Sequence, residues 1–499
     1  MTSGEGTFST LRFTTTLLIL LLLPGCFFSP PECELCGDPG DDICIPAEGV
    51  GPPPDACGTF VSSSADEGGD GSKSRPLRSL AAALAAAPAG ANVYACGERF
   101  EEAVVVPSGV RLYGGLDCGN GFWYAEDLRA EIAPTTGPIA MFLEHGPHET
   151  RVVDVRVLAA PALRGGGSSI AALVDRAAVV LVRTTLRARD AEAGDDGEPF
   201  DEPAPSGVDG SPGNEACTAV EVAGGKAVGT LCEAGSTTGG RGGDGLPDAG
   251  TDGADGAPGA LPNHGAGQPP NDPNTRCSAG SIGASGMDGA PGLGGGYGGR
   301  GTIGPFGFVG ENGTDGSPGA VAQGGGGGGG SRGGAGVWEC AGPIPGGASG
   351  GGGGSGGCGG RGGRGGTGGG ASIALISLWP SQISFEAVTL IAGRGGDGGA
   401  GGPGQMGGAG GAGGKGGSAP VGTTLLSACS GGPGGFGGMG GTGGGGAGGP
   451  SIGVAFTGAQ PVTAGADISV GAPGLGGIGD GPSGTGSIGV AAGTLAMDP

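Results

Sequence analysis

The 499-residue chain is poor in the residues that build ordinary globular cores and basic binding surfaces. Aromatic residues make up 4% of the sequence and charged residues 14%, which argues against one uniform globular core. Only three lysines occur, Lys73, Lys226 and Lys415, and the formal net charge is −24. This excess of acidic residues argues against nucleic acid as a partner, because proteins bind its phosphates through clustered lysine and arginine. The acidity instead predicts a solvated, self-repelling surface or cation binding.

The apolar run near the N-terminus, Leu17 to Leu23, is too short to span a bilayer. We therefore predict that residues 1–25 are a signal peptide. The sequence Leu23-Pro24-Gly25-Cys26 resembles the lipobox of bacterial lipoproteins, which implies lipidation of Cys26 and a membrane as partner through the lipid anchor. Phe27, rather than Asp, follows the cysteine, and by the same resemblance this implies the outer membrane or cell surface. The alternative is ordinary signal-peptidase cleavage, which leaves Cys26 a spare thiol.

The cysteine count also favours export. Thirteen cysteines less Cys26 leave an even number, which predicts up to six disulfides in an oxidising compartment. Four of them lie in residues 26–65, a Cys/Pro-rich tether, where Cys33 and Cys36 form a CxxC that we interpret as part of a disulfide-stapled linker rather than a redox or zinc motif. Cys96 and Cys118 are expected to pair. The disulfide candidates are Cys33, Cys36, Cys44, Cys57, Cys96, Cys118, Cys217, Cys232, Cys277, Cys340, Cys358 and Cys429.

Glycine and proline, 133 and 39 residues, make up 172 of the 499 positions, about 34%. Glycine fills every third position from Gly283 to Gly319, and Gly-Gly-x triplets run from Gly395 to Ser418 and resume at Gly431. A period of three matches a polyproline II helix, but prolines are too few for a collagen triple helix. We interpret residues 233–370 and 393–450 as insertions that form either a bundle of polyproline II strands or disordered chain. In composition alone they resemble the repeat region of mycobacterial PGRS proteins.

Four stretches look like copies of one short unit. They begin at Ile139, Ile170, Ile373 and Ile452. A second apolar strand follows about sixteen residues later, around Val155, Leu186, Leu390 and Ile468. Such self-similarity predicts a solenoid whose coils occupy residues 136–232, 371–392 and 451–499. Ala216 to Leu231 is interpreted as a degenerate fifth copy, and Ser487 to Val490 as a truncated last one.

Residues 66–135 are predicted to form an N-terminal cap and a first coil. An Ala/Leu helix with Ser74 as N-cap is followed by short strands at Asn92–Ala95, Ala103–Val106 and Val110–Tyr113. The segment from Asp70 to Gly115 resembles the N-terminal segment of bacterial surface proteins in the pectate-lyase-like superfamily. It reads "DGSKSRPLRSLAAALAAAPAGANVYACGERFEEAVVVPSGVRLYGG". The resemblance implies an all-β fold, a right-handed parallel β-helix whose open end is capped by the helix.

Candidate chemistry is sparse, and no catalytic residue is assigned. The charges Asp154, Arg156, Asp175 and Arg176 are interpreted as solvent-face pairs. His145 and His148 lie in a turn that is more typical of exposed polar residues than of a metal site. The acidic run from Asp190 to Asp209 is interpreted as a solvated loop without EF-hand spacing. Within it, the candidates for a Ca²⁺ site are Asp195, Asp196 and Glu198.

These features favour a non-enzymatic structural or adhesive lipoprotein of the cell surface. The alternative is a polysaccharide-binding or polysaccharide-degrading β-helix protein. A weaker third hypothesis is ice binding by flat polyproline II surfaces.

Overall fold

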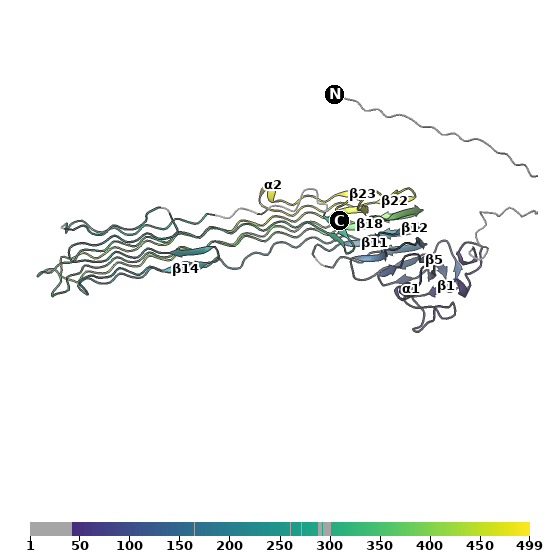
Figure 1. Cartoon of the computed structure of the whole chain (residues 1–499), viewed down its shortest axis with the longest axis horizontal. Coiled ribbons are helices and arrows are strands. Elements are labelled where there is room, and N and C mark those ends of the chain that lie inside the picture. Colours follow the sequence, from purple (N-terminus) through teal and green to yellow (C-terminus); the bar gives the residue numbers. More distant parts are fainter. Residues whose placement is uncertain (1–41, 164, 260, 271, 288–291, 293–300) are drawn as a thin grey trace, which may run out of the picture.

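The computed structural model describes residues 42–499 except 164, 260, 271, 288–291 and 293–300. The protein is mostly β, with several parallel sheets, and a long bundle of extended segments projects from the strands (Figure 1). The predicted signal peptide, Cys26, Cys33 and Cys36 lie outside the described residues. No helix in the described ranges is long and apolar enough to cross a membrane.

Three sheets hold most of the strands, and nearly all neighbouring strands within them pair in parallel. Sheet 1 contains, in order, β1 (Gly58–Val61), β2 (Asn92–Cys96), β5 (Arg111–Asp117), β9 (Thr150–Val153), β12 (Ala178–Val182) and β19 (Gln382–Glu386), with β6 (Trp123–Tyr124) antiparallel to β5. Sheet 2 contains β3 (Arg99–Phe100), β7 (Ala130–Ile132), β10 (Val155–Leu158), β13 (Thr185–Arg187), β20 (Val388–Ile391) and β22 (Ala466–Ser469). Sheet 3 contains β4 (Val104–Val106), β8 (Ile139–Leu143), β11 (Ser169–Asp175), β18 (Ser372–Leu378), β21 (Ser451–Phe456) and β23 (Ala491–Ala496).

The remaining elements are short. Two antiparallel hairpins pair β14 (Gly229–Cys232) with β15 (Gly235–Thr238) and β16 (Thr302–Gly304) with β17 (Gly307–Val309). The helices are α1 (Leu80–Ala86) and α2 (Gly481–Gly484), with 3-10 turns at Asp42–Cys44 and Asp55–Cys57.

The predicted alignment of the four copies is confirmed. Ile170 pairs with Ile139 on one side and with Ile373 on the other, and Ile373 pairs with Ile452. The second strands align Val157, Leu186, Leu390 and Ile468 in sheet 2. Ile170 and Ile373 pair directly although 203 positions separate them in the sequence. The long tract between them therefore leaves the sheet and returns to it in register.

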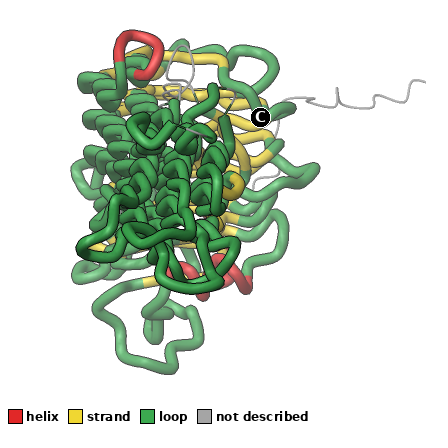
Figure 2. Tube along the Cα trace, turned by 90° about the vertical axis from the view of Figure 1, so that its left-hand side faces the viewer, coloured by secondary structure: helices red, strands yellow, loops and turns green. Residues whose placement is uncertain are grey.

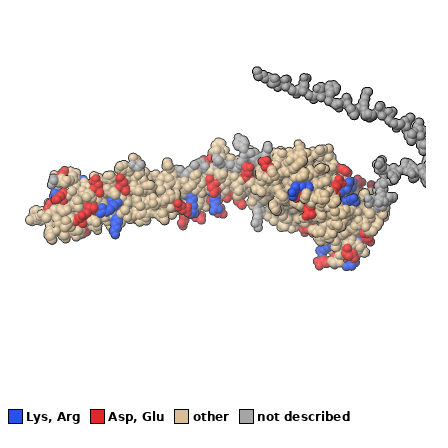
Figure 3. All heavy atoms as spheres, viewed as in Figure 1, with Lys and Arg blue, Asp and Glu red and all other residues tan. Residues whose placement is uncertain are grey.

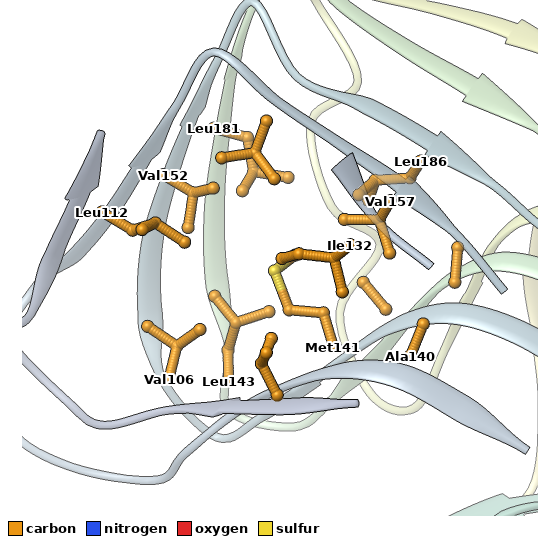
Figure 4. Close-up of a cluster of buried hydrophobic side chains, with 14 of the residues drawn as sticks. Val106, Leu112, Ile132, Ala140, Met141, Leu143, Val152, Val157, Leu181 and Leu186 are labelled. Carbon is orange, nitrogen blue, oxygen red and sulfur yellow. The ribbon is translucent and has the colours of Figure 1, made fainter. Parts of the chain in front are cut away.

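One apolar core lies between the three sheets. Leu112 of sheet 1, Ile132 of sheet 2 and Met141 of sheet 3 are fully buried and belong to one cluster. Figure 4 shows these side chains pointing toward one another from three sides. Alternate residues of each strand supply this core because successive side chains of a strand point to opposite faces.

Helix α1 begins five residues later than predicted. Its N-cap is Ser79, whose Oγ accepts a hydrogen bond from the Ala82 N–H at 3.1 Å, and not Ser74. The physical reason is that Leu77 is engaged as a strand neighbour: its N–H donates to Phe60 O, and its carbonyl accepts from Ser62 N–H. The buried residues Leu80 and Leu84 pack into the same core as the sheets.

The glycine-rich tracts run side by side and exchange hydrogen bonds at every third residue. In the 394–417 segment, Gly396, Gly399 and Gly402 donate to Gly370, Thr367 and Arg364 at 2.8–2.9 Å. The preceding glycines Gly395, Gly398 and Gly401 donate to Ala472, Leu475 and Ile478 at 2.8–3.0 Å. The two consecutive glycines of each triplet thus donate hydrogen bonds to two different neighbouring segments. Seen along the bundle, the segments are stacked in front of the strands (Figure 2).

The number of glycines in each triplet follows the number of neighbours that the segment contacts. In the buried stretch 324–330, a Cβ on Gly325, Gly326 or Gly327 would overlap a carbonyl of a different segment in each case. At the edge, Gly316 and Gly319 would overlap a neighbour, whereas the residues between them are exposed. Glycine is required wherever backbones approach without room for a side chain.

Two predicted copies are wrong. Ala216 to Leu231 is not a fifth copy, because its last residues, Gly229 to Leu231, lie in the β14–β15 hairpin rather than in a parallel sheet. The predicted last copy at Ser487–Val490 lies directly before the strand that pairs with β21. That strand is β23, in which Ala492 is the partner of Ile452. Between residues 136 and 232, the described strands of the three sheets end with β13. The chain from Ala191 to Gly213 then runs beside the 394–415 segment.

Candidate functional site

The far end of the bundle is built from turns that are tied to one another. The Cys217 N–H donates to Gly346 O at 2.9 Å, and the Gly346 N–H donates back to Ala219 O at 3.0 Å. The Thr424 N–H donates to Trp338 O at 2.7 Å. These bonds join three turns, at residues 217–221, 335–346 and 419–428, which we call the distal turns.

Disulfides hold this part of the molecule. Three bridges connect segments of the bundle: Cys217–Cys340, Cys232–Cys358 and Cys277–Cys429. A small buried cluster of Ala216, Cys340, Ala348 and Leu425 lies beneath the distal turns. Glycine-rich chain buries little apolar side-chain surface, so covalent bridges that restrict the unfolded chain offset part of its conformational entropy.

Apolar side chains at the distal turns point into solvent. Val337 is 91% exposed, Trp338 67%, and Val421 is fully exposed. Val220 and Ile344 are also exposed on the same turns. The one described ion pair within these turns and their flanks joins Arg332 to Glu339 at 3.1 Å. Apolar side chains are also exposed elsewhere, among them Phe306 at 94% and Leu231 at 85%, but those of the distal turns lie on segments that hydrogen bonds and a disulfide tie together. Exposed apolar groups held together in this way form a candidate interaction surface.

Two further disulfides lie in the strand-rich part. Cys96 pairs with Cys118, as predicted, and Cys44 pairs with Cys57. All ten candidate cysteines within the described residues are therefore bridged.

The prediction that Asp154 is a solvent-face charge paired with Arg156 is wrong. Asp154 is 1% exposed, and its carboxylate contacts Arg183 at 2.6 Å and Arg129 at 3.2 Å. The Tyr124 hydroxyl donates to the same carboxylate at 3.1 Å. The reason is that Asp154 sits at the turn between β9 and β10 with a φ of 56°, so the strand alternation used to predict exposure does not apply there.

The carboxylate changes the titration of its partners. Its hydrogen bond raises the pKa of the Arg183 guanidinium, and burial followed by the Asp154 charge raises the pKa of Tyr124. Both groups therefore keep their protons, which suits a structural ion pair rather than proton transfer. Arg156 instead pairs with Glu131 at 3.5 Å. Arg176 pairs with Asp175 at 2.8 Å as predicted, but Asp175 is only 7% exposed, so the prediction of a solvent-face charge is wrong for that residue.

The acidic run from Asp190 to Asp209 has a definite structural use. Asp190, Asp196 and Asp209 accept hydrogen bonds from the backbone N–H groups of residues 394, 400 and 412 at 2.6–2.7 Å. Ala400 and Ala412 occupy the third position of Gly-Gly-x triplets, and Arg394 lies in the same phase directly before the first triplet. Each aspartate therefore supplies the acceptor that the neighbouring backbone does not provide.

The Ca²⁺ candidates Asp195, Asp196 and Glu198 do not converge on a metal site. Within the described ranges no three Asp, Glu, His or Cys side chains are arranged to hold an ion. The signal that could have revealed the role of Asp190 and Asp196 is their six-residue spacing, which equals that of their partners and is a multiple of three.

Charges do not gather into a basic patch on the face shown in Figure 3, where acidic and basic side chains are interspersed along the bundle. No family model, curated protein or solved structure matches this chain.

Proposed function

We propose that this protein is a non-enzymatic, exported lipoprotein of the cell surface with a structural or adhesive role. In this proposal the three sheets are the faces of a right-handed parallel β-helix of the pectate-lyase-like kind, capped by α1. The glycine-rich tracts are a bundle of polyproline II helices that carries the distal turns away from the membrane. Lipidation of Cys26 in the outer membrane anchors the opposite end.

The β-helix part is supported by the order in which the chain visits the sheets. The passes β8–β9–β10, β11–β12–β13 and β18–β19–β20 each go from sheet 3 to sheet 1 to sheet 2. A chain that winds in this way stacks each rung on the previous one and leaves open ends. A terminal helix that buries Leu80 and Leu84 against the first strands would cover one of them.

The polyproline II part is supported by the three-residue period of the hydrogen bonds between segments. A helix with three residues per turn returns each N–H to the same direction every third position, and polyproline II has this repeat. These lateral bonds, together with the three bridges within the bundle, favour an ordered bundle over disordered insertions.

The observation that carries the adhesive role is the exposure of Val337, Trp338 and Val421 on cross-linked turns at the end of the bundle. Exposing such side chains costs solubility unless they bind something. A rigid support that presents them far from the strand-rich end suits contact with another surface.

An attachment assay tests this role. The full chain, displayed on a bacterial host, is expected to increase attachment to a hydrophobic surface, and the double variant Trp338→Ser/Val421→Ser to abolish most of the increase. Met406→Ser is the control, because Met406 is also 67% exposed but lies along the 394–417 segment. Equal attachment by all three chains would contradict the adhesive role. Release of a Cys26→Ser chain into the medium tests the anchor separately.

Polysaccharide cleavage remains the alternative and is tested by incubating the purified chain with polysaccharides and measuring new reducing or unsaturated ends. Cleavage lost in Asp154→Asn or Arg156→Gln would favour the enzymatic hypothesis. The pairing of Asp154 with two arginines, which holds the carboxylate in the turn, supports the non-enzymatic one.

A further inference from the structure

Two neighbouring segments of the bundle, residues 394–417 and 431–449, share an edge that a third segment covers over only part of its length. The two contact each other throughout, since the N–H groups of glycines in 431–449 donate to carbonyls in 396–414. Residues 471–479 lie against both segments near the strand-rich part. The chain then leaves them at Asp480, where α2 follows (Figure 1). Both segments continue beyond this point toward the distal turns.

The covered part shows how these two segments hold a further strand. The Gly401 N–H donates to Ile478 O at 2.8 Å, and the Gly477 N–H donates to Gly446 O at 2.8 Å. The same two bonds recur three residues earlier in the strand. One segment therefore supplies donors and the other supplies acceptors, and the strand pairs with both through the three-residue repeat of polyproline II.

The strand needs glycine at every third position. A Cβ on Gly477 would overlap the carbonyl of Gly399 on the neighbouring segment, and the same holds three residues earlier. The position before the glycine accepts proline, as Pro473 shows, and the position after it is largely exposed, as Leu475 shows at 57%. The next position in the glycine phase is Asp480, and its side chain explains why the strand ends there.

Past the end of this strand, the backbone groups that continue the pattern have no hydrogen-bond partner among the described residues. These donors and acceptors form a surface that we call the open edge. They are the N–H groups of the partly exposed Gly404, Gly407, Gly410 and Gly413 and the carbonyls of Gly431, Gly434, Gly437 and Gly440. A row of backbone groups without partners is a template for pairing with another chain, as at the edge of a β-sheet.

We propose that the open edge binds a glycine- and proline-rich segment of another protein, of repeat Gly-x-Pro, as an additional polyproline II strand. The bound strand runs parallel to 394–417, as 471–479 does, and its glycine N–H groups donate to the carbonyls of 431–440. From Gly404 to Gly413 the edge is about 28 Å long at the polyproline II rise. Proline holds the free segment in this conformation and so lowers the entropy cost of binding.

A strand from another protein suits the open edge better than a second copy of this chain does. The described glycine-rich segments of this chain already exchange hydrogen bonds within their own bundle, so a second copy has no such segment to insert. The proposal does not depend on the adhesive role of the distal turns.

Two fluorescent peptides test the proposal by anisotropy with the purified chain. One consists of four Gly-Leu-Pro repeats and the other of four Ala-Leu-Pro repeats, which keep the proline content but add a Cβ at each backbone contact. The glycine peptide is expected to bind at least tenfold more tightly. Its binding should also slow hydrogen exchange of the 404–413 amides and leave the 350–355 amides unchanged, because these are already bonded to other segments of the bundle.

A variant that gains affinity separates binding from folding. In the covered part the Leu475 N–H donates to Asp397 Oδ1 at 2.7 Å. Ala409 lies in the same phase of the 394–417 segment, beside the open edge, and is exposed. Ala409→Asp should therefore tighten binding of the glycine peptide about threefold to tenfold. Ala254→Asp adds the same charge at an exposed position of a different segment and is the matched control, with unchanged affinity expected.

The proposal is overturned if the glycine peptide fails to bind, if the alanine peptide binds equally well, or if exchange slows outside residues 404–413. Equal affinities of the Ala409→Asp and Ala254→Asp chains would contradict the placement of the strand beside Ala409. Slower exchange of the 404–413 amides on raising the protein concentration without peptide, with a dimer in sedimentation, would overturn the choice of partner in favour of a second copy. Loss of attachment in the Trp338→Ser/Val421→Ser chain would leave these results unaffected.

Discussion

Asp154 and Arg183 form an ion pair between successive passes of the chain, with Arg183 Nη2 2.6 Å from Asp154 Oδ2. The two residues occupy equivalent turns, after β9 and after β12, and Ala387 occupies the next one after β19. All three have positive φ, between 46° and 56°. The backbone continues the relationship, since the Asp154 N–H donates to Val182 O and the Arg183 N–H to Glu386 O. The turns therefore stack with the strands.

Removing the carboxylate should destabilise the strand-rich part. Asp154→Ala leaves Arg183 and Arg129 without their shared anion, and we expect a loss of about 2–3 kcal/mol, reduced from the buried-pair range because Arg183 is about one-third exposed. Urea unfolding followed by circular dichroism measures it. Arg156→Ala, which breaks the more exposed pair with Glu131, should cost less than about 1 kcal/mol. Equal losses in the two variants would argue against a special role for Asp154.

A side chain added inside the bundle should disrupt it, whereas a change on its surface should not. A Cβ on Gly408 would overlap the carbonyl of Pro205, so Gly408→Ala is expected to destabilise the bundle by about 1–3 kcal/mol. The adjacent Ala409 is exposed, and Ala409→Ser should be nearly neutral. Hydrogen exchange of the 394–417 amides compares them. Similar protection in both variants would show that the packing around Gly408 is loose.

The bridge Cys277–Cys429 should stabilise the distal turns locally. It spans 152 residues, for which loop-closure arguments give about 5 kcal/mol, whereas disulfides typically contribute about 2–4 kcal/mol. Cys277→Ser/Cys429→Ser should therefore make residues 419–430 more sensitive to limited proteolysis while the sheets stay protected. Cys96→Ser/Cys118→Ser is the control, because it removes a bridge from the strand-rich part. A common proteolysis pattern for both variants would contradict local stabilisation.

Glu98 should make stability depend on pH in the acidic range. Burial alone would raise its pKa, but hydrogen bonds from Ser63, Ser64 and Ser62 lower it below the ordinary value. Because the folded pKa lies below the unfolded one, this stabilisation is present above the unfolded pKa and is lost as pH falls through the folded pKa. The Tm advantage of the unmodified chain over Glu98→Gln should thus shrink on acidification from pH 6 to pH 3. A constant difference over that range would contradict this assignment.

The apolar strands of the repeated unit and their alignment could be predicted from the sequence, because the pattern that specifies them lies within each short stretch. Ile139, Ile170, Ile373 and Ile452 each begin an apolar strand of similar pattern, and apolar alternation specifies register strongly when one face is buried. The glycine period also revealed where backbones touch, since only glycine fits at such contacts. The helix boundary was less predictable, because Leu77 is taken up by pairing with β1 rather than by the helix.

The burial and the partners of the charged side chains could not be predicted from the local sequence pattern. Alternation along β9 and β10 predicted an exposed Asp154, but a left-handed turn between the strands turns it inward to partners on other passes. Likewise, the six-residue spacing of Asp190 and Asp196 matches that of their partners, but it does not indicate which segment supplies the amide that the Asp196 carboxylate accepts from, that of Ala400. Both contacts join residues that are brought together only when the passes and segments stack.

By itself, the sequence determined the aliphatic rungs, the even set of cysteines and the three-residue period of the glycine tracts, because each depends on side-chain type and spacing along the chain. The tertiary structure decided which of the distant cysteines pair, which segments surround the polyglycine stretch at residues 324–330 and which arginines contact Asp154. Those outcomes depend on the distance between residues that are far apart in sequence, and that distance is fixed by how the passes stack and where each tract turns back.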